Sequence, residues 1–258
     1  MESEVPFELY NNGLTIVKGS IGAIRNVNII LDTGTNPTTI SKQMADDLNL
    51  QGIGELQFTL NGAVPVQAVV LSRIQIGGLT VGSIKAVVQD LSFLDHKLGI
   101  SIAGIAGLDV LTAGNFMIDY RKKNIVFGQM KARRNSVPFA TRTPFLAVKA
   151  KIEGQPVLLL LDSGSFGLLL YRNCIRIPPE QLYPDGNALI ESAAGTMRSR
   201  WFLASSVKLG KENLGQRSVV IADLDRTSRD DFDGLLGFVN MGFHQVFFDF
   251  ENGRFGWN

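Results

Sequence analysis

The feature that most constrains this chain is a short pattern that occurs twice. The first copy spans residues 28–35 (NIILDTGT) and the second spans residues 158–165 (LLLLDSGS). In each copy an apolar run ends at an acid, Asp32 or Asp162, followed by a small hydroxyl residue, a glycine and a second hydroxyl residue. A short apolar run bounded by turn residues is typical of a buried strand, and the residues after it indicate a tight turn.

Two such turns in one chain predict one shared site. An acid at the end of a buried strand lies at the rim of the core, where burial and a neighbouring charge can change its pKa. Taken alone, either acid could simply cap its own turn. Because Asp32 and Asp162 stand in matching frames, we interpret them as a pair of carboxyl groups, one from each half of the chain.

Further matches in the same order extend the repeat over nearly the whole chain. The matched segments are VPF at 5–7 and 137–139, IQIG at 74–77 and VKLG at 207–210, VVQDL at 87–91 and VIADL at 220–224, GIAG at 104–107 and GLLG at 234–237, and IDY at 118–120 and FDF at 248–250. We therefore predict an internal duplication, with an N-terminal lobe at residues 1–132 and a C-terminal lobe at residues 133–258.

The pattern within each half predicts an all-β fold. The chain has 27 glycines, many of them between short apolar runs, which favours strands and turns over long helices. For the first half we expect strands over 14–18 and 26–31, a short helix over 41–48 with Ser41 as its N-cap, a hairpin over 56–76 with Asn61-Gly62 at its tip, and a closing hairpin around 121–124. The second half is expected to repeat this plan.

Composition and charge exclude several classes of protein. The net charge of +1 gives no reason to expect a nucleic acid or an anionic membrane as partner. No apolar run is long enough for a transmembrane helix, and the opening residues MESE are not a signal peptide. We expect a periplasmic or secreted protein if an upstream signal has been removed, and a cytoplasmic one otherwise. Cys174 is the only cysteine, so no internal disulfide can form, and we interpret it as a small buried apolar residue.

Other catalytic chemistries find no support in the residue spacing. His96 and His244 share no ligand spacing with the cysteine or with each other, so no metal site is predicted. Ser163 lacks the Gly-x-Ser-x-Gly frame of a serine nucleophile, and the GIG at 52–54 lacks the third glycine of a dinucleotide loop. Asp119 and Asp249 also match across the repeat, but they precede aromatic residues in the closing hairpins and are interpreted as structural.

The paired motifs resemble those of bilobal aspartic peptidases of the pepsin-like and retropepsin-like group. The resemblance rests on LDTGT at 31–35 with IAG at 105–107, and on LDSGS at 161–165 with LLG at 235–237. Each final glycine follows its acid by 75 residues (107 − 32 and 237 − 162). A lone Asp-Thr-Gly arises easily by chance, whereas two copies with the same downstream partner do not. The resemblance implies two β-rich lobes with a cleft between them.

The same resemblance implies an endopeptidase that acts as a monomer on an extended peptide or protein substrate. Asp32 and Asp162 would share a proton, one carboxylate activating a water while the other acid donates toward the carbonyl oxygen. Water would be the nucleophile, so no cofactor would be required. The alternative is a catalytically silent relative that binds peptides or proteins in the cleft. A processing peptidase with one narrow substrate is a third hypothesis.

The resemblance also assigns support roles to the neighbours of the acids. Thr33 and Ser163 would brace the two turns against each other, Gly34 and Gly164 would let backbone amides approach the carboxylates, Thr35 and Ser165 would hydrogen-bond the outer carboxylate oxygens, and the hairpin at Asn61, Gly62 and Ala63 would be a flap over the substrate. This hairpin departs from the pepsin-like pattern because it has no aromatic residue at its tip; the nearest is Phe58. We therefore expect substrates to be held by backbone hydrogen bonds and apolar pockets, with cleavage between bulky apolar residues.

Overall fold

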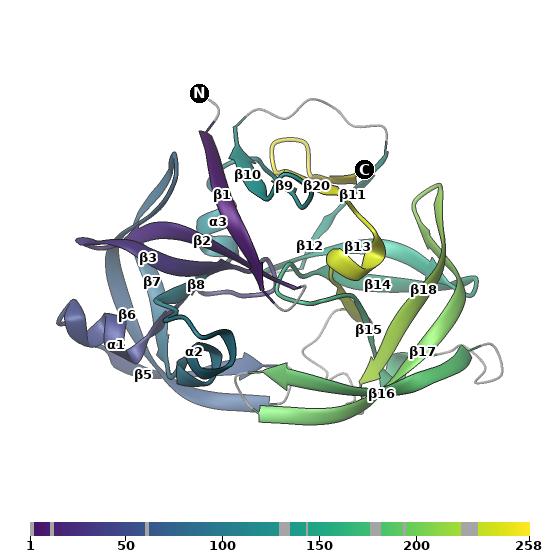
Figure 1. Ribbon diagram of the computed structural model, residues 1–258, viewed down its shortest axis with the longest axis horizontal. Helices are drawn as coiled ribbons and strands as arrows, with labels where there is room; N and C mark the ends of the chain where they lie inside the picture. The colour runs from purple at the N-terminus through teal and green to yellow at the C-terminus, as the bar shows by residue number, and fades with distance from the viewer. Residues whose placement is uncertain are drawn as a thin grey trace.

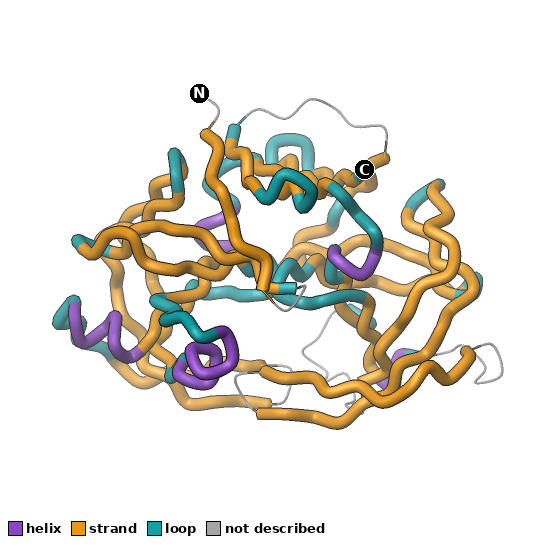
Figure 2. Tube along the Cα trace, in the orientation of Figure 1, coloured by secondary structure: helices purple, strands orange, loops and turns teal. Residues whose placement is uncertain are grey.

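The structure of this protein is a computed structural model that describes residues 3–10, 13–59, 62–128, 135–142, 144–175, 182–192, 195–222 and 232–258. Strands make up most of these residues, with short helical segments between them (Figure 2). The prediction of an all-β fold is therefore confirmed. Among the helices in these ranges, none combines the length and the apolar character needed to cross a bilayer.

The first half folds into short strands with three small helices. Its elements are β1 (Ser3–Tyr10), β2 (Leu14–Ile21), β3 (Ile24–Leu31), β4 (Thr39–Ser41), α1 (Lys42–Asp47), β5 (Ile53–Thr59), β6 (Gly62–Ile76), β7 (Leu79–Gln89), α2 (Ser92–Leu98), β8 (Gly104–Ala106), α3 (Leu108–Leu111), β9 (Phe116–Asp119) and β10 (Asn124–Phe127). The expected helix is α1, and Ser41 caps it by accepting a hydrogen bond from the N–H of Met44 at 3.1 Å.

The second half contains a similar series. Its elements are β11 (Asn135–Pro138), β12 (Ala140–Arg142), β13 (Phe145–Ile152), β14 (Gln155–Leu161), β15 (Leu168–Tyr171), η1 (Arg172–Cys174), β16 (Leu182–Ser192), β17 (Gly195–Leu209), β18 (Glu212–Ala222), β19 (Gly234–Leu236), η3 (Val239–Met241), β20 (Gln245–Asp249) and β21 (Arg254–Trp257). Where α1 follows β4 in the first half, the 3₁₀ turn η1 follows β15 in the second, and the described residues of this segment end at residue 175.

Seven strands pair in the same order in each half. The first half has the order β2-β3-β8-β4-β7-β6-β5, and the second half has β13-β14-β19-β15-β18-β17-β16. In addition β2 pairs with β6, and β13 with β17. The strand that precedes each acid is parallel to its neighbour, β3 to β8 and β14 to β19. The two acids therefore follow equivalent strands of two sheets that have the same pairing order.

A further set of strands joins the halves, and we call it the seam. It has the order β11-β21-β20-β9-β10-β1 and lies along the upper part of the view in Figure 1. The central pair is β9 with β20, in which Phe116 lies opposite Phe248. Their rings stack with centroids 4.7 Å apart. Because β9 belongs to the first half and β20 to the second, the seam ties the two halves together by backbone hydrogen bonds and by aromatic packing.

The main hydrophobic core runs beneath the seam and continues into both halves. Its largest fully buried side chains are Phe116, Phe238, Phe248 and Phe255. Truncating a buried phenylalanine to alanine typically costs about 3–5 kcal/mol, so this aromatic group is a main source of the stability that holds the halves in register. Cys174 is half-buried rather than fully buried, at the edge of a smaller apolar cluster around Tyr171 and Phe232.

Asp119 and Asp249 cap the turns that follow their strands, in agreement with their structural interpretation. Asp119 Oδ1 accepts hydrogen bonds from the N–H groups of Arg121 and Lys122 at 3.0 and 2.9 Å. Asp249 Oδ1 accepts one from the N–H of Asn252 at 3.0 Å. Each carboxylate satisfies backbone donors of a closing hairpin, which is an ordinary use of aspartate in turns.

The long hairpin of the first half is present, but its turn lies one residue earlier than predicted. Strands β5 and β6 pair as far as Thr59 opposite Gly62. The connection is therefore residues 60–61, which lie outside the described residues, so the predicted flap residue Asn61 lies there too, and Gly62 and Ala63 already belong to β6. Register is set by which face of the strands is buried as well as by turn preference, and the Asn-Gly signal alone placed the turn one position too late.

The matching hairpin of the second half, β16–β17, ends in the same way. Ser192 lies opposite Gly195, so the connection is residues 193–194, again outside the described part of the chain. Both hairpins reach toward the middle of the lower edge of the view in Figure 1.

Candidate active site

The two acids hold the same place at the ends of their strands. Asp32 directly follows β3, and its N–H donates to the carbonyl of Ala106 at 3.0 Å. Asp162 directly follows β14, and its N–H donates to the carbonyl of Leu236, also at 3.0 Å. These bonds extend the parallel pairing with β8 and β19 by one residue. Each acid turn therefore begins where the sheet ends, with the acid at the rim of the core.

A glycine next to each acid turn explains the apolar-apolar-Gly segments of the sequence. A β carbon at Gly107 would lie 2.4 Å from the carbonyl oxygen of Thr35, and one at Gly237 would lie 2.1 Å from that of Ser165. Nonbonded carbon and oxygen atoms do not approach so closely, so only glycine fits at these two positions. The repeated spacing of 75 residues in the sequence thus corresponds to one packing contact made in both halves.

Thr33 and Ser163 hold the two turns together through reciprocal hydrogen bonds. The N–H of Thr33 donates to Ser163 Oγ and the N–H of Ser163 donates to Thr33 Oγ1, both at 3.0 Å. The Thr33 hydroxyl donates to the carbonyl of Leu161 at 2.9 Å, and the Ser163 hydroxyl donates to that of Leu31 at 3.0 Å. Both side chains are almost fully buried. Losing one partner would leave a buried polar group unsatisfied, so this network fixes the turns relative to each other.

Gly34 and Gly164 bring the two carboxyl groups into contact. A β carbon at Gly34 would lie 2.6 Å from Cγ of Asp162, and one at Gly164 would lie 2.7 Å from Cγ of Asp32. Each glycine therefore lies directly against the acid of the other turn, where any side chain would displace the carboxyl group. With both glycines in place, the carboxyls of Asp32 and Asp162 lie close enough for the charge of one to act directly on the other.

The two acids differ in the donors that surround them. Asp32 accepts from the N–H of Gly34 on Oδ1 at 2.8 Å and from the hydroxyl of Thr35 on Oδ2 at 2.7 Å. Asp162 accepts two backbone N–H bonds on Oδ1 alone, from Gly164 at 2.9 Å and from Ser165 at 3.1 Å.

The hydroxyl of Ser165 does not take the part expected of it. It donates to the carbonyl of Gly167 at 3.3 Å instead of reaching the outer oxygen of Asp162. The acceptor, the carbonyl of Gly167, lies two residues further along the same turn. The first half has Pro37 at the matching position, and Thr35 turns to its acid instead.

These surroundings favour a proton on Asp162. Burial, the negative charge of Asp32 and the hydrogen bond with the Asp32 carboxyl raise the pKa of Asp162 well above its usual range, and the amides of Gly164 and Ser165 oppose this only in part. Two carboxyls in contact cannot both ionise easily, so the protons belong to the pair as a unit. Asp32 differs in having a donor on each of its oxygens.

A second carboxylate supports the first turn, and the repeat gave no sign of it. Asp109 accepts a hydrogen bond from the Thr38 hydroxyl at 2.6 Å and another from the Thr38 N–H at 3.0 Å. The Thr38 hydroxyl in turn accepts from the N–H of Gly107 at 3.0 Å. In the second half, Leu168 and Val239 stand at the matching positions. Only the fold, which brings α3 beside the turn, reveals this contact.

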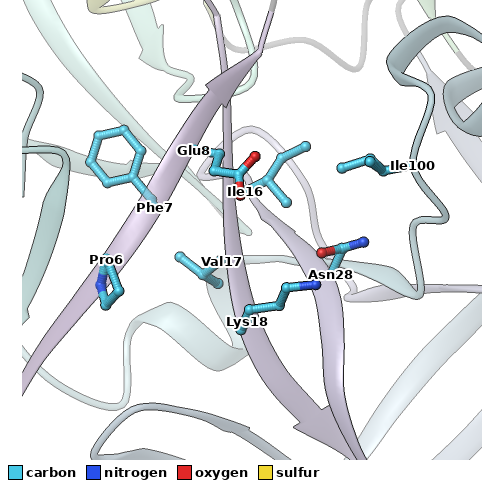
Figure 3. A pocket seen from close by; sticks show the side chains of 8 residues that line it. All are labelled: Pro6, Phe7, Glu8, Ile16, Val17, Lys18, Asn28 and Ile100. Carbon is cyan, nitrogen blue, oxygen red and sulfur yellow. The ribbon is translucent and has the colours of Figure 1, made fainter.

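A hollow elsewhere on the first half contains no pair of acids. It lies over β1, β2 and β3 (Figure 3), and its lining residues are Pro6, Phe7, Glu8, Ile16, Val17, Lys18, Asn28 and Ile100. Glu8 is its single carboxylate, and the hydroxyl of Tyr10 donates to it at 2.7 Å. The chemistry described above therefore belongs to the two acid turns and not to this hollow.

Comparison with known families agrees with the first half of the site. Residues 17–110 match the model of a family described as aspartyl protease. The matched range contains Asp32 with its turn and the downstream Gly107, and it ends before the second acid turn. This match supports an aspartic peptidase. No curated protein matches the chain significantly.

Proposed function

We propose that this protein is an aspartic-type endopeptidase that hydrolyses peptide bonds with a water molecule activated between Asp32 and Asp162. One observation carries the proposal: the two carboxyls meet across the reciprocal Thr33–Ser163 network, with a glycine of each turn against the opposite acid. A pair of turns that only capped themselves would not need this contact. The aspartyl protease match over residues 17–110 supports the same chemistry.

The unequal surroundings of the acids suggest how they divide the work. Charged Asp32 would accept a proton from the attacking water, and protonated Asp162 would donate its proton to the carbonyl oxygen of the substrate. The water oxygen then bonds to the carbonyl carbon, which gives a tetrahedral diol. In the second step Asp32 returns its proton to the leaving nitrogen, the C–N bond breaks, and one diol hydroxyl gives its proton back to Asp162. Both acids end in their starting states, and one water has been consumed.

The arrangement of the halves suggests where the substrate lies. We assign residues 1–132 and 133–258 to two lobes, with an extended peptide between them beside the acid pair. The β5–β6 and β16–β17 hairpins would cover it and exclude water, as flaps do. Because one chain supplies both acids, a monomer would be sufficient for activity.

A digest of a mixed peptide library tests the proposal. The wild-type chain should produce new peptide ends, detected by mass spectrometry over a range of pH, and Asp32→Asn and Asp162→Asn should produce none while melting cooperatively. Asp249→Asn is the matched control, since this acid ends strand β20 and caps the turn after it, away from the acid pair. If the wild-type chain binds library peptides without cleaving any, it is the catalytically silent relative. Cleavage of very few sequences would indicate a processing peptidase.

A further inference from the structure

An exposed aromatic pair lies beside the second acid turn. Phe166 immediately follows Ser165, and its ring meets that of Trp201 edge to face, with centroids 6.4 Å apart. Phe166 is 40% exposed, although the residues that follow it in β15 are buried. A large apolar ring left uncovered next to the acid pair is a surface that an apolar partner would bury.

The backbone around Phe166 is fixed, so its ring is presented in a defined position. Its carbonyl accepts from the N–H of Asn240 at 3.0 Å. The next residue, Gly167, accepts from the N–H of Gly237 at 2.9 Å and from the Ser165 hydroxyl at 3.3 Å. The ring of Phe166 is therefore carried by the same hydrogen-bonded turn that carries Asp162.

Trp201 extends this surface into a small apolar cluster that is separate from the main core. The cluster has four buried members, Leu169, Ala188, Val220 and Ala222, and four half-buried ones, Ile190, Met197, Trp201 and Leu235. Leu235 lies in β19, and the carbonyl of the next residue, Leu236, accepts a hydrogen bond from the N–H of Asp162. The cluster thus reaches from the β16–β17 hairpin to the edge of the acid pair.

The first half has no such pair at the matching positions. The residue after Thr35 is Asn36, where the second half has Phe166. Trp201 lies opposite Val220 in the β17–β18 pairing, and in the β6–β7 pairing the matching residue, opposite Val87, is Ala68. An asparagine and a buried alanine therefore replace the two aromatic rings.

We propose that Phe166 and Trp201 form one wall of a substrate subsite on the second half's side of the acid pair, which takes an aromatic or large aliphatic side chain of the bound peptide. The inference rests on the proposed peptidase function and adds the orientation in which the peptide binds. The two halves have the same strand pairing order, but only one of them has the aromatic wall. The peptide therefore binds in one orientation between them. The two rings would give the substrate an aromatic contact, whereas the sequence at the tip of the first hairpin contains no aromatic residue.

The kinetic test uses two peptides that differ at one position near the bond that the wild-type chain cleaves, one with Phe and one with Ala. At the position facing this subsite, Phe166→Ala should lower kcat/KM for the Phe peptide about tenfold or more and leave the Ala peptide within about twofold. Phe166→Leu should restore part of the preference. Leu189→Ala is the matched control, because Leu189 is 67% exposed and its strand neighbours Ala188 and Ile190 lie in the cluster, which places Leu189 on the opposite face.

A binding test separates this inference from the proposed function. The test uses the Asp32→Asn variant, so that the peptide is bound but not cleaved. Trp201 is half-buried, whereas the other tryptophan, Trp257, is 3% exposed. A change in tryptophan fluorescence on adding the Phe peptide therefore reports on Trp201. We expect a shift with the Phe peptide that is lost in Phe166→Ala and kept in Leu189→Ala. If Phe166→Ala changes both peptides equally, or neither, the subsite is wrong even though hydrolysis stands. If the wild-type chain cleaves nothing, the binding test uses a library peptide with Phe and its Ala counterpart. If the fluorescence pattern holds for that pair, the peptidase proposal fails and the aromatic subsite survives.

Discussion

The two halves repeat one frame but differ in polarity at matching places. The first half has Thr38 with Asp109 where the second has Leu168 with Val239, and it has Asn36 where the second has the exposed ring of Phe166. The hydroxyl after the acid turn bonds to the acid in the first half and to a backbone carbonyl in the second. The shared frame sets the distance between the acids. Under our proposals, the differences set which acid carries the proton and on which side an aromatic side chain of the substrate would bind.

The largest expected effect comes from removing either acid. Asp32→Asn and Asp162→Asn should each lower kcat by roughly 10³-fold or more, because general acid–base catalysis needs both groups. The double variant should be little worse than either single variant, since the pair acts as one unit. The measurement is kcat on one peptide, with cooperative melting as the control for folding. A single variant that keeps near-normal turnover would separate the acids into independent groups.

The glycines opposite the acids test whether both halves hold the pair equally tightly. Gly34→Ala should displace the carboxyl of Asp162, and Gly164→Ala that of Asp32, because the added β carbon would lie under 3 Å from Cγ in both cases. We expect each variant to lose roughly 10²-fold in kcat with about 1–3 kcal/mol of stability. Gly114→Ala is the control for changing a glycine in itself, because its β carbon would make only an ordinary contact of 3.8 Å with Leu79 and its backbone does not need a positive φ. A large loss from only one of the two would show that the contact is unequal.

The hydroxyls after the glycines should break the symmetry. Thr35→Val removes the donor to Asp32 Oδ2 while keeping the side-chain shape, so kcat should fall about tenfold. Ser165→Ala removes only the bond to the Gly167 carbonyl, and kcat should stay within about twofold. Steady-state kinetics on the same peptide compares the two variants directly. Equal losses would mean that the hydroxyl of Ser165 reaches Asp162 during turnover.

The raised pKa of Asp162 predicts a stability effect whose sign depends on pH. A group whose pKa is higher in the folded state contributes stability below its unfolded pKa, about 3.9, and loses it as pH rises through the folded value. Asp162→Asn removes the titrating group, so the variant should melt near the wild type at pH 3 and a few °C above it at pH 7 (about 2–4 °C for each kcal/mol). Asp46→Asn, at an exposed position of α1, should show no such trend. A variant less stable than wild type at pH 7 would contradict this sign.

The smallest effect concerns a buried polar pair that the second half replaces with apolar residues. Thr15 Oγ1 and Tyr120 Oη are both buried, and neither has a hydrogen bond of ordinary geometry within the described part of the chain. Burial raises the pKa of Tyr120, and the nearby hydroxyl of Thr15 opposes this only in part. Phe250 matches Tyr120 across the repeat, and the β13–β14 register places Leu146 where Thr15 stands. Thr15→Val with Tyr120→Phe should leave stability unchanged or raise it by about 1 kcal/mol. Chemical denaturation measures it; a clear loss would indicate partners for the two hydroxyls.

The sequence predicted those parts of the fold whose sequence pattern occurs in both halves. The strands before each acid, the closing hairpins and the two acid turns could all be placed from apolar runs and turn residues. The contact between Thr33 and Ser163 was expected from the family resemblance, and the structure shows both hydroxyls at that interface. These features depend on local residue types that recur at a fixed offset.

Contacts found in only one half could not be predicted in this way. Asp109 binds Thr38 across 71 residues without a counterpart in the repeat, and Phe166 meets Trp201 only because β17 returns beside the turn. The hydroxyl of Ser165 found a competing acceptor in its own turn. The pairing of Thr59 with Gly62 places Gly62 in a strand, one residue away from the tip that the Asn-Gly signal predicted. Each of these depends on a tertiary neighbour that no local pattern encodes.

The seam is the last part of the protein that can be completed during synthesis. Strands β20 and β21 follow all others in the sequence, yet β20 pairs with β9, which is made much earlier. Until residues 245–257 have been made, the edge of β9 has no partner, and the stacked Phe116 lacks Phe248. The two acid turns then lack the sheet that ties the halves together. We expect that a ribosome-bound chain that ends before β20 has no peptidase activity, so that the nascent chain is protected from its own active site.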